Sequence, residues 1–230
     1  MNRITRLLFV SLIPFAGSAV KGAPDRYPNT IYLIRHGAYN DQGPNLGSFK
    51  AGLTPLGIAQ ARLVAARLRG MPVHFDSMVS SNMQRAIDTA AIIHEMLPNV
   101  PWERSSIIHE VEPPRLDKEP TTPDETADAN AAAHRLDEAF AKYFVPGEGS
   151  EKHTILVCHG NVIRYFVMKA LKVDTRAWSR ISIGHTSITV ISVGPRGGFR
   201  VLSVGDMGHL PANMQSGIFD PNPELVVPAN

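Results

Sequence analysis

The sequence predicts an α/β fold in which a mostly parallel β-sheet carries helices on both faces. Two short, largely apolar runs, Thr30–Ile34 and Thr154–Cys158, lack polar alternation and are typical of strands buried on both sides. Segments with the period of amphipathic helices follow such runs along the chain. Strands that alternate with helices pair into parallel sheets, so this order predicts the class.

The first half of the chain is expected to contain two strand and helix units. Thr54 and Pro55 are typical of an N-cap followed by the first helical residue, and Pro98 ends the second helix. The predicted elements are a strand at Thr30–Ile34, a loop at Ala38–Gly52, a helix from Thr54 to Gly70, a strand at Phe75–Val79 and a helix at Met83–Met96.

The second half begins with Glu103–Glu125, which is rich in proline and charge and has no sustained period, so we expect a long surface loop there. The remaining predicted elements are a helix at Ala127–Phe144, a strand at Thr154–Cys158, a helix at Val162–Leu171, and a closing hairpin of Ser187–Val193 and Phe199–Val204. One domain at 29–211 is therefore expected, followed by an irregular C-terminal tail at 212–230.

Composition narrows the classes of protein. The formal net charge of +2 over 230 residues does not indicate a nucleic-acid partner. Cys158 is the single cysteine, so an intrachain disulfide is excluded.

Residues 1–23 resemble a signal peptide or membrane anchor, because Arg3 and Arg6 precede an apolar run and cleavage after Ala19 fits the small residues there. Export is the expected outcome, with membrane anchoring or a mitochondrial presequence as alternatives, and a membrane contact only if the leader is retained.

The central observation is that both buried strands end in a histidine, at Arg35-His36-Gly37 and at Cys158-His159-Gly160. Ligands of open α/β sheets bind beyond the carboxyl ends of the strands. If the two strands are neighbours, both imidazoles and Arg35 face one pocket, and the helix that starts near Asn161 offers unpaired backbone N–H groups to an anion. This pattern predicts a phosphate site.

Phosphoryl transfer requires a nucleophile, donors for the phosphoryl oxygens and an acid for the leaving oxygen. His36 can attack phosphorus through one ring nitrogen while the other is held by a carbonyl, and Arg35, Arg85 and His159 can bind the oxygens. Glu110 is the candidate proton donor. Three carboxylates in the same loop compete with it: Glu112, Asp117 and Glu119.

Several motifs resemble the histidine phosphatase, or phosphoglycerate mutase-like, superfamily over residues 29–211. They are Arg35–Gly37, Leu53–Gly57, Ser80–Ala86, Cys158–Tyr165, Ser187–Thr189 and Gly205–Pro211, and the last three look most like the mitochondrial serine/threonine-protein phosphatase branch. The resemblance implies a three-layer phosphoglycerate mutase-like fold and a phosphohistidine intermediate on His36. It also implies a phosphate cage of Arg35, Arg85 and His159, with Glu110 as the acid and no metal or organic cofactor.

The function expected from this resemblance is phosphomonoester hydrolysis of a phosphoprotein or a small phosphoester. Ala38-Tyr39-Asn40 departs from the mutase pattern, which argues against mutase activity. The alternatives left open are a small-molecule phosphatase or mutase of the same superfamily, or a module that binds a phosphorylated ligand without turnover. The oligomeric state is not predicted.

Two further readings of the residues are weaker. Cys158 and Arg164 have the Cys-x5-Arg spacing of thiol phosphatases, but the intervening residues look helical and only Gly160 is conformationally free. The other histidines show no metal-ligand spacing and are expected to be structural. They are His74, His94, His109, His134, His153, His185 and His209.

Overall fold

A computed structural model of the chain describes residues 26–40 and 48–218. Among these residues, six strands form one sheet in the order β4-β3-β6-β2-β7-β8. The strands are β2 Asn29–Arg35, β3 Ser77–Ser81, β4 Trp102–Ser105, β6 Lys152–Cys158, β7 Ile188–Val193 and β8 Phe199–Asp206. The four strands from β4 to β2 run parallel, whereas β7 is antiparallel to β2 and to β8. The predicted α/β class is confirmed, and the sheet is mixed at one end.

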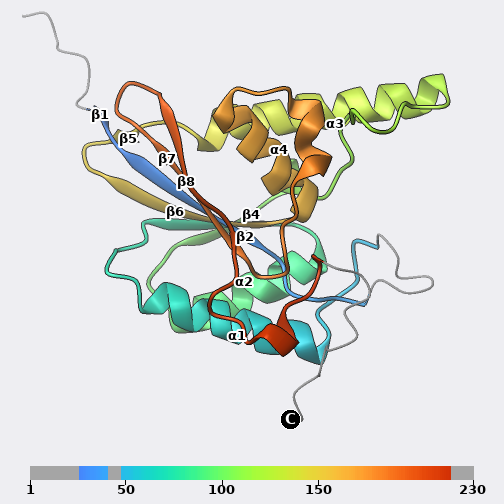
Figure 1. Cartoon of the computed structure of the whole chain (residues 1–230). Helices are drawn as coiled ribbons and strands as arrows, with labels where there is room; N and C mark the ends of the chain where they lie inside the picture. The colour runs from blue at the N-terminus through green and yellow to red at the C-terminus, as the bar shows by residue number, and fades with distance from the viewer. Residues whose placement is uncertain (1–25, 41–47, 219–230) are drawn as a thin grey trace, which may run out of the picture.

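Two helices cover each face of the sheet (Figure 1). α1 Pro55–Arg69 and α2 Gln84–Met96 lie on one face, and α3 Pro123–Tyr143 and α4 Gly160–Leu171 lie on the other. The short elements are the antiparallel pair β1 Arg26–Tyr27 and β5 Gly147–Glu148, and the 3-10 turns η2 Ser106–Ile108, η3 Thr175–Arg180 and η4 Ala212–Met214. The expected three layers are present.

The central strands are apolar on both sides because each face has its own core. In β2, Ile31 and Leu33 pack with α3 and α4, while Tyr32 and Ile34 pack with α1 and α2. β6 alternates in the same way, with Leu156 toward the α4 layer. This alternation between two apolar layers explains why the two runs show no alternation of polar and apolar residues.

Helix α1 begins where the sequence predicted. The Thr54 side chain accepts a hydrogen bond from the Gly57 N–H (3.2 Å), and Pro55 occupies the first turn, where its missing N–H costs nothing. Helix α3 uses the same signals, because Thr122 accepts from the Glu125 N–H (3.1 Å) before Pro123. α3 therefore begins at Pro123 rather than at the expected Ala127.

Strand β4 was missed, because Glu103–Glu125 was expected to be a loop throughout. Trp102–Ser105 is a short edge strand with two exposed charged residues, so it lacks the apolar alternation that marks a strand. It nevertheless pairs in parallel with β3. Its carboxyl end therefore reaches the same edge of the sheet as those of β2, β3 and β6.

Smaller differences concern element ends and the tail. β3 lies at Ser77–Ser81 rather than Phe75–Val79, since Phe75 packs edge-on against Tyr32 before the strand starts. Part of the tail expected to be irregular forms η4, and Met214 is buried against α1. The predicted leader, 1–23, lies outside the described residues. No helix within 26–40 and 48–218 is long and apolar enough to span a membrane.

Candidate active site

Parallel pairing of β2 with β6 brings the two strand-end histidines together. Arg35 is in register with Cys158, and the His36 N–H continues the ladder by donating to the Cys158 carbonyl (3.0 Å). His36 directly follows the last residue of β2, and His159 directly follows the last residue of β6. Their ring centroids lie 5.1 Å apart. The two imidazoles therefore share one site at the carboxyl edge of the sheet.

The His36 ring has one nitrogen held and one directed at a cation. Its Nδ1 lies 2.8 Å from the Gly37 carbonyl oxygen, so Nδ1 carries the proton and donates it. Its Nε2 then has a free lone pair, which accepts from Arg85 Nε (3.2 Å). Burial, together with the nearby positive charges of Arg35 and Arg85, holds the pKa of His36 well below its usual range. His36 is a neutral imidazole with an available lone pair on Nε2.

Backbone contacts with α1 and α2 fix the turn that carries His36. The Gly37 N–H donates to Thr89 Oγ1 (3.0 Å), and the Ala38 N–H donates to Gln60 Oε1 (2.9 Å). A Cβ on Gly57 would lie 2.0 Å from the Ala38 carbonyl oxygen, so only glycine permits this approach of α1. The approach explains the spacing of the Leu53–Gly57 motif.

Arg85 enters the site from the first turn of α2, immediately after β3. Its side chain is buried, and besides His36 it donates to the Ser48 carbonyl (3.2 Å). Its guanidinium lies over the Tyr39 ring, 4.4 Å from the centroid. Burial lowers the pKa of Arg85 from its ordinary value, with Tyr39 and Glu110 acting in the opposite direction.

One nitrogen of the Arg35 guanidinium is hydrogen-bonded, and another has no hydrogen-bond partner among the described residues. One terminal nitrogen donates to the carbonyls of Ile183 (2.6 Å) and Gly217 (3.0 Å). Its Nε is buried and has no hydrogen-bond partner among the described residues. Burial lowers the pKa of Arg35 to about 10, which leaves the group positive at neutral pH.

The proton of His159 is directed by Ser81, at the end of β3. Ser81 Oγ accepts from the Met83 N–H (3.3 Å), so its own proton is available to His159 Nε2 at 2.8 Å. Donation of that proton to Nε2 corresponds to the tautomer with the His159 proton on Nδ1, an atom that is buried and unpartnered within the described part of the chain. Burial and the two arginines hold the pKa of His159 well below its usual range. His159 therefore presents a neutral N–H donor.

Glu110 reaches the site from the loop that follows η2, beyond β4. Burial raises the pKa of Glu110, and the charges of Arg35 and Arg85 partly offset that rise. Its three predicted competitors are exposed: Glu112 and Asp117 form ion pairs with Arg115, and Glu119 lies near Arg176. Of these four carboxylates, the geometry brings Glu110 to the histidines.

Asn161 has a different setting from the one expected. Its backbone N–H donates to Glu110 Oε1 (3.3 Å), and its side-chain amide donates to the Val111 carbonyl (3.0 Å). The helix N-terminus is thus already engaged with a carboxylate of the same chain. These contacts connect Asn161 to the Glu110 loop, and its direct role in phosphate binding stays a prediction.

His185 was expected to be structural, but it lies in the site. Its ring centroid is 5.5 Å from that of His36. β7 is antiparallel to β2, so the start of β7 lies at the edge where the parallel strands end. That topology is the signal that would have placed His185 beside His36.

Comparison with known proteins identifies the family. A model described as histidine phosphatase superfamily (branch 1) matches residues 31–150 and 110–207, which is most of the chain. The chain belongs to the histidine phosphatase superfamily. The resemblance on which the sequence expectations rested is confirmed at this level.

Two relatives in the superfamily show how far the similarity extends. The mitochondrial serine/threonine-protein phosphatase Pgam5 of Caenorhabditis elegans is 38% identical over 192 residues, which cover 80% of this chain and 64% of the relative. The protein of the same name from Drosophila virilis is 36% identical over 195 residues, with 79% and 64% covered. The chain thus spans less than two thirds of the length of these relatives.

Solved structures of the superfamily share the fold. Phosphoglycerate mutase of Plasmodium falciparum aligns with a TM-score of 0.57 at 24% identity, covering 81% of this chain and 96% of that one. The alpha-ribazole phosphatase of Shigella flexneri aligns with a TM-score of 0.62 at 16% identity, covering 77% and 96%. At these identities the likeness establishes the fold alone.

Two other chemistries are disfavoured by the surroundings of the residues. Donor atoms of His36, Glu110 and His159 lie within 4.8 Å of one another, a spacing that suits a metal ion. The positive charges of Arg35 and Arg85 beside them favour an anion over a dication.

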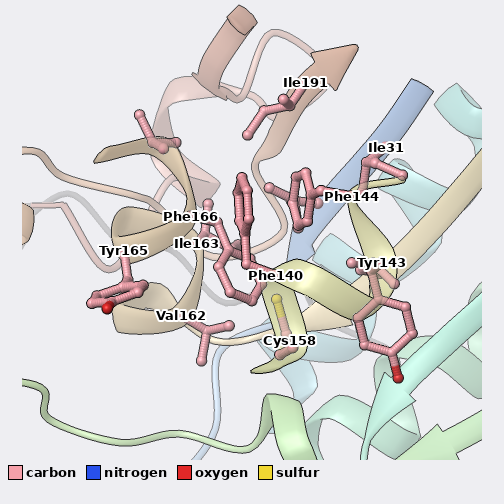
Figure 2. Packing of buried hydrophobic residues seen from close by; sticks show 14 of the residues in the cluster. Ile31, Phe140, Tyr143, Phe144, Cys158, Val162, Ile163, Tyr165, Phe166 and Ile191 are labelled. Atoms are coloured by element: carbon pink, nitrogen blue, oxygen red, sulfur yellow. The ribbon is translucent and has the colours of Figure 1, made fainter. Parts of the chain in front are cut away.

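Cys158 lies in the apolar core with Phe140 and Val162 (Figure 2), and burial raises the pKa of its thiol. A buried thiol that stays protonated is a poor nucleophile. The surroundings of Cys158 therefore do not favour the Cys-x5-Arg reading.

Proposed function

We propose that the protein is a phosphomonoester hydrolase that works through a phosphohistidine on His36. The observation that carries this proposal is the state of the His36 ring. Nδ1 is bound to the Gly37 carbonyl, the imidazole is neutral, and the Nε2 lone pair faces Arg85. A nucleophile with that orientation and a cation in front of it suits an incoming phosphoryl group.

The reaction has two steps. In the first, His36 Nε2 attacks phosphorus, the bond from phosphorus to the leaving oxygen breaks, and Glu110 gives its proton to that oxygen. In the second, water attacks the phosphohistidine, the Glu110 carboxylate takes a proton from the water, and the N–P bond breaks. Inorganic phosphate leaves, and His36 and Glu110 return to their starting protonation states.

The charge that develops on the phosphoryl oxygens has donors on several sides. Arg85 shifts from the His36 lone pair to an oxygen, Arg35 offers its unpartnered Nε, and His159 offers its unpartnered Nδ1 proton. Asn161 also acts as a positioning residue for Glu110.

The proposed substrate class is a phosphorylated serine or threonine in a protein. It is supported by the 38% identity to a relative whose name gives that activity. The alternatives are a small phosphoester, a mutase reaction, or binding without turnover. In the proposed hydrolase and in the two enzymatic alternatives, the groups around phosphorus would do the same chemistry, and the surrounding loops would select the substrate.

A hydrolysis screen tests this proposal. The chain from Ala23 onward is assayed with phosphoserine and phosphothreonine peptides, sugar phosphates, nucleotides and an aryl phosphate, with release of inorganic phosphate as the readout. We expect turnover of the aryl phosphate and the highest kcat/KM on the phosphopeptides. A preference for a small phosphoester would overturn the substrate class, and vanadate binding without any turnover would favour the binding module.

The N-terminal residues 1–23 are proposed to be a targeting leader. Export is the expectation from the residues themselves, and mitochondrial import is the alternative that the names of the relatives support. N-terminal analysis of protein isolated from separated compartments of its native cells tests both. A chain that begins at Val20 in an exported fraction agrees with export, and recovery from mitochondria contradicts it.

A further inference from the structure

His185 is held beside the nucleophile by contacts on both sides of its backbone. The His185 N–H donates to the Ser216 carbonyl (2.9 Å), and the Thr186 N–H donates to the Arg35 carbonyl (3.0 Å). Thr186 has φ of 52°, a left-handed conformation that is uncommon for a β-branched residue. Such strain persists only where the surrounding contacts enforce it. The turn therefore fixes the His185 ring, which lies 5.5 Å from that of His36.

A chain of hydrogen bonds favours one nitrogen of His185 as the carrier of the proton. The Ala38 N–H donates to Gln60 Oε1 (2.9 Å), which orients the amide so that its NH2 group faces the C-terminal segment. Gln60 Nε2 then donates to the Met214 carbonyl (2.7 Å) and to Ser216 Oγ (2.9 Å). Ser216 Oγ accepts from Gln60, so its own proton is available to His185 Nδ1 at 2.9 Å.

From this relay we infer the tautomer of His185 with its proton on Nε2. That atom is buried and has no hydrogen-bond partner among the residues that the structure describes. A buried donor without a partner is unfavourable unless a ligand uses it. His159 has the same arrangement, in which one ring nitrogen lies at hydrogen-bond distance from Ser81 Oγ (2.8 Å) and the other has no partner among the described residues. Two imidazoles, each oriented by a serine, thus flank His36.

We propose that His185 is a further phosphate-binding residue, whose Nε2–H group donates a hydrogen bond to an oxygen of the bound phosphoryl group. The contact of Ser216 with Nδ1 keeps the ring in the tautomer that has this proton on Nε2. The inference rests on the proposed function and adds a fourth side chain to Arg35, Arg85 and His159. Burial and the charges of Arg35 and Arg85 keep the pKa of His185 well below its usual range, so the ring stays neutral.

Replacement of His185 by two different side chains tests the donor role in the full chain. His185→Phe keeps a ring but removes the donor, whereas His185→Gln places an amide N–H near the position of Nε2. Loss of one charge-assisted hydrogen bond predicts that His185→Phe lowers kcat/KM about 10- to 100-fold and weakens vanadate binding by a similar factor. His185→Gln should recover most of both.

The matched control is His153→Phe. His153 lies on β6 far from its carboxyl end, and its ring is also partly buried, with Nδ1 at 3.4 Å from the Tyr32 hydroxyl. This variant should keep the wild-type kcat/KM and vanadate affinity. Thermal unfolding of every variant shows whether a loss of activity reflects a loss of fold.

A double-mutant cycle tests the role of Ser216 as a positioning residue. Ser216→Ala removes the proton that holds His185 in its tautomer, so we expect a several-fold loss of vanadate affinity in the wild-type background. In the His185→Phe background the same change should have no further effect, because it acts through His185. An equal loss in both backgrounds would overturn the relay.

Failure of the inference is distinguishable from failure of the proposed function. If His185→Phe matches the wild type within twofold while His36→Ala is inactive, the donor role is wrong and the hydrolase stands. If His185→Phe and His185→Gln are equally impaired and both stay folded, an amide N–H does not restore the lost function, and the donor role is also wrong. If the wild type binds vanadate but hydrolyses nothing, the proposed function fails, and vanadate affinity alone decides on His185.

Discussion

Replacing His36 by Ala should lower turnover of every hydrolysed phosphoester by roughly 10⁴-fold or more. The Nε2 lone pair is the atom that forms the bond to phosphorus, and no other described side chain occupies its place between Gly37 and Arg85. The phosphate-binding groups remain, so vanadate affinity should fall far less than kcat. Steady-state kinetics and vanadate titration of the same preparation measure both quantities.

The control for His36→Ala is Cys158→Ala. Cys158 packs against apolar side chains, so alanine is preferable to serine, whose hydroxyl would be buried in the same cluster. Its thiol has a raised pKa through burial and should take no part in the reaction. Wild-type kinetics of a folded Cys158→Ala variant support the histidine mechanism. Loss of activity on Cys158→Ala, with His36→Ala still active, would reverse the assignment.

Glu110→Gln should lower kcat/KM about 10²- to 10⁴-fold on an alkyl phosphate such as a phosphoserine peptide. An alkoxide leaving group needs a proton as the bond to phosphorus breaks, and glutamine cannot supply one. A nitrophenyl phosphate has a stable leaving anion, so its kcat/KM should fall less than about tenfold. Equal losses on both substrates would contradict the role of Glu110 as the acid.

The pH dependence of kcat/KM provides a second measure of Glu110. His36 must be neutral, so kcat/KM rises as pH increases through its pKa, which lies well below 6.5. Glu110 must be protonated, so kcat/KM falls as pH increases through its pKa, which burial raises above 4.5. The profile of kcat/KM is therefore bell-shaped between these two pKa values, and Glu110→Gln should lack the alkaline decline. Glu112→Gln, at an exposed carboxylate of the same loop, is the matched control and should keep the wild-type profile.

The sequence was sufficient to predict that each of the two central histidines follows the carboxyl end of a buried strand. Both buried strands were apolar without alternation, and both ended in a histidine followed by glycine. Parallel neighbours must align their carboxyl ends, so only the pairing of β2 with β6 had to be supplied by the structure. Arg85 was predicted from its motif, through the resemblance to the superfamily.

Residues that depend on long-range topology were harder to predict. β4 is short, charged and at the sheet edge, so its sequence pattern did not indicate a strand. Without β4, the position of the following loop, and therefore of Glu110, could not be predicted. The contacts of Asn161 depend on that same loop. His185 was missed because its place follows from β7 running antiparallel to β2, a fact about pairing rather than about local sequence.

The C-terminal segment illustrates the same limit. Its Pro- and Asn-rich composition predicted an irregular tail, yet Met214, Ser216 and Gly217 contact Gln60, His185 and Arg35 through hydrogen bonds. These contacts join the end of the described chain to the site. The local sequence pattern could not predict these hydrogen bonds, because each of them joins residues that are distant along the chain.

Trapping the covalent intermediate tests the central claim most directly. The protein is mixed with a substrate labelled in its phosphoryl group, quenched in alkali within one turnover, digested and analysed by mass spectrometry. We expect phosphate on Nε2 of His36, stable in alkali and lost in acid, and its absence from the His36→Ala protein. Phosphate on another residue, or turnover without any labelled protein, would contradict the mechanism.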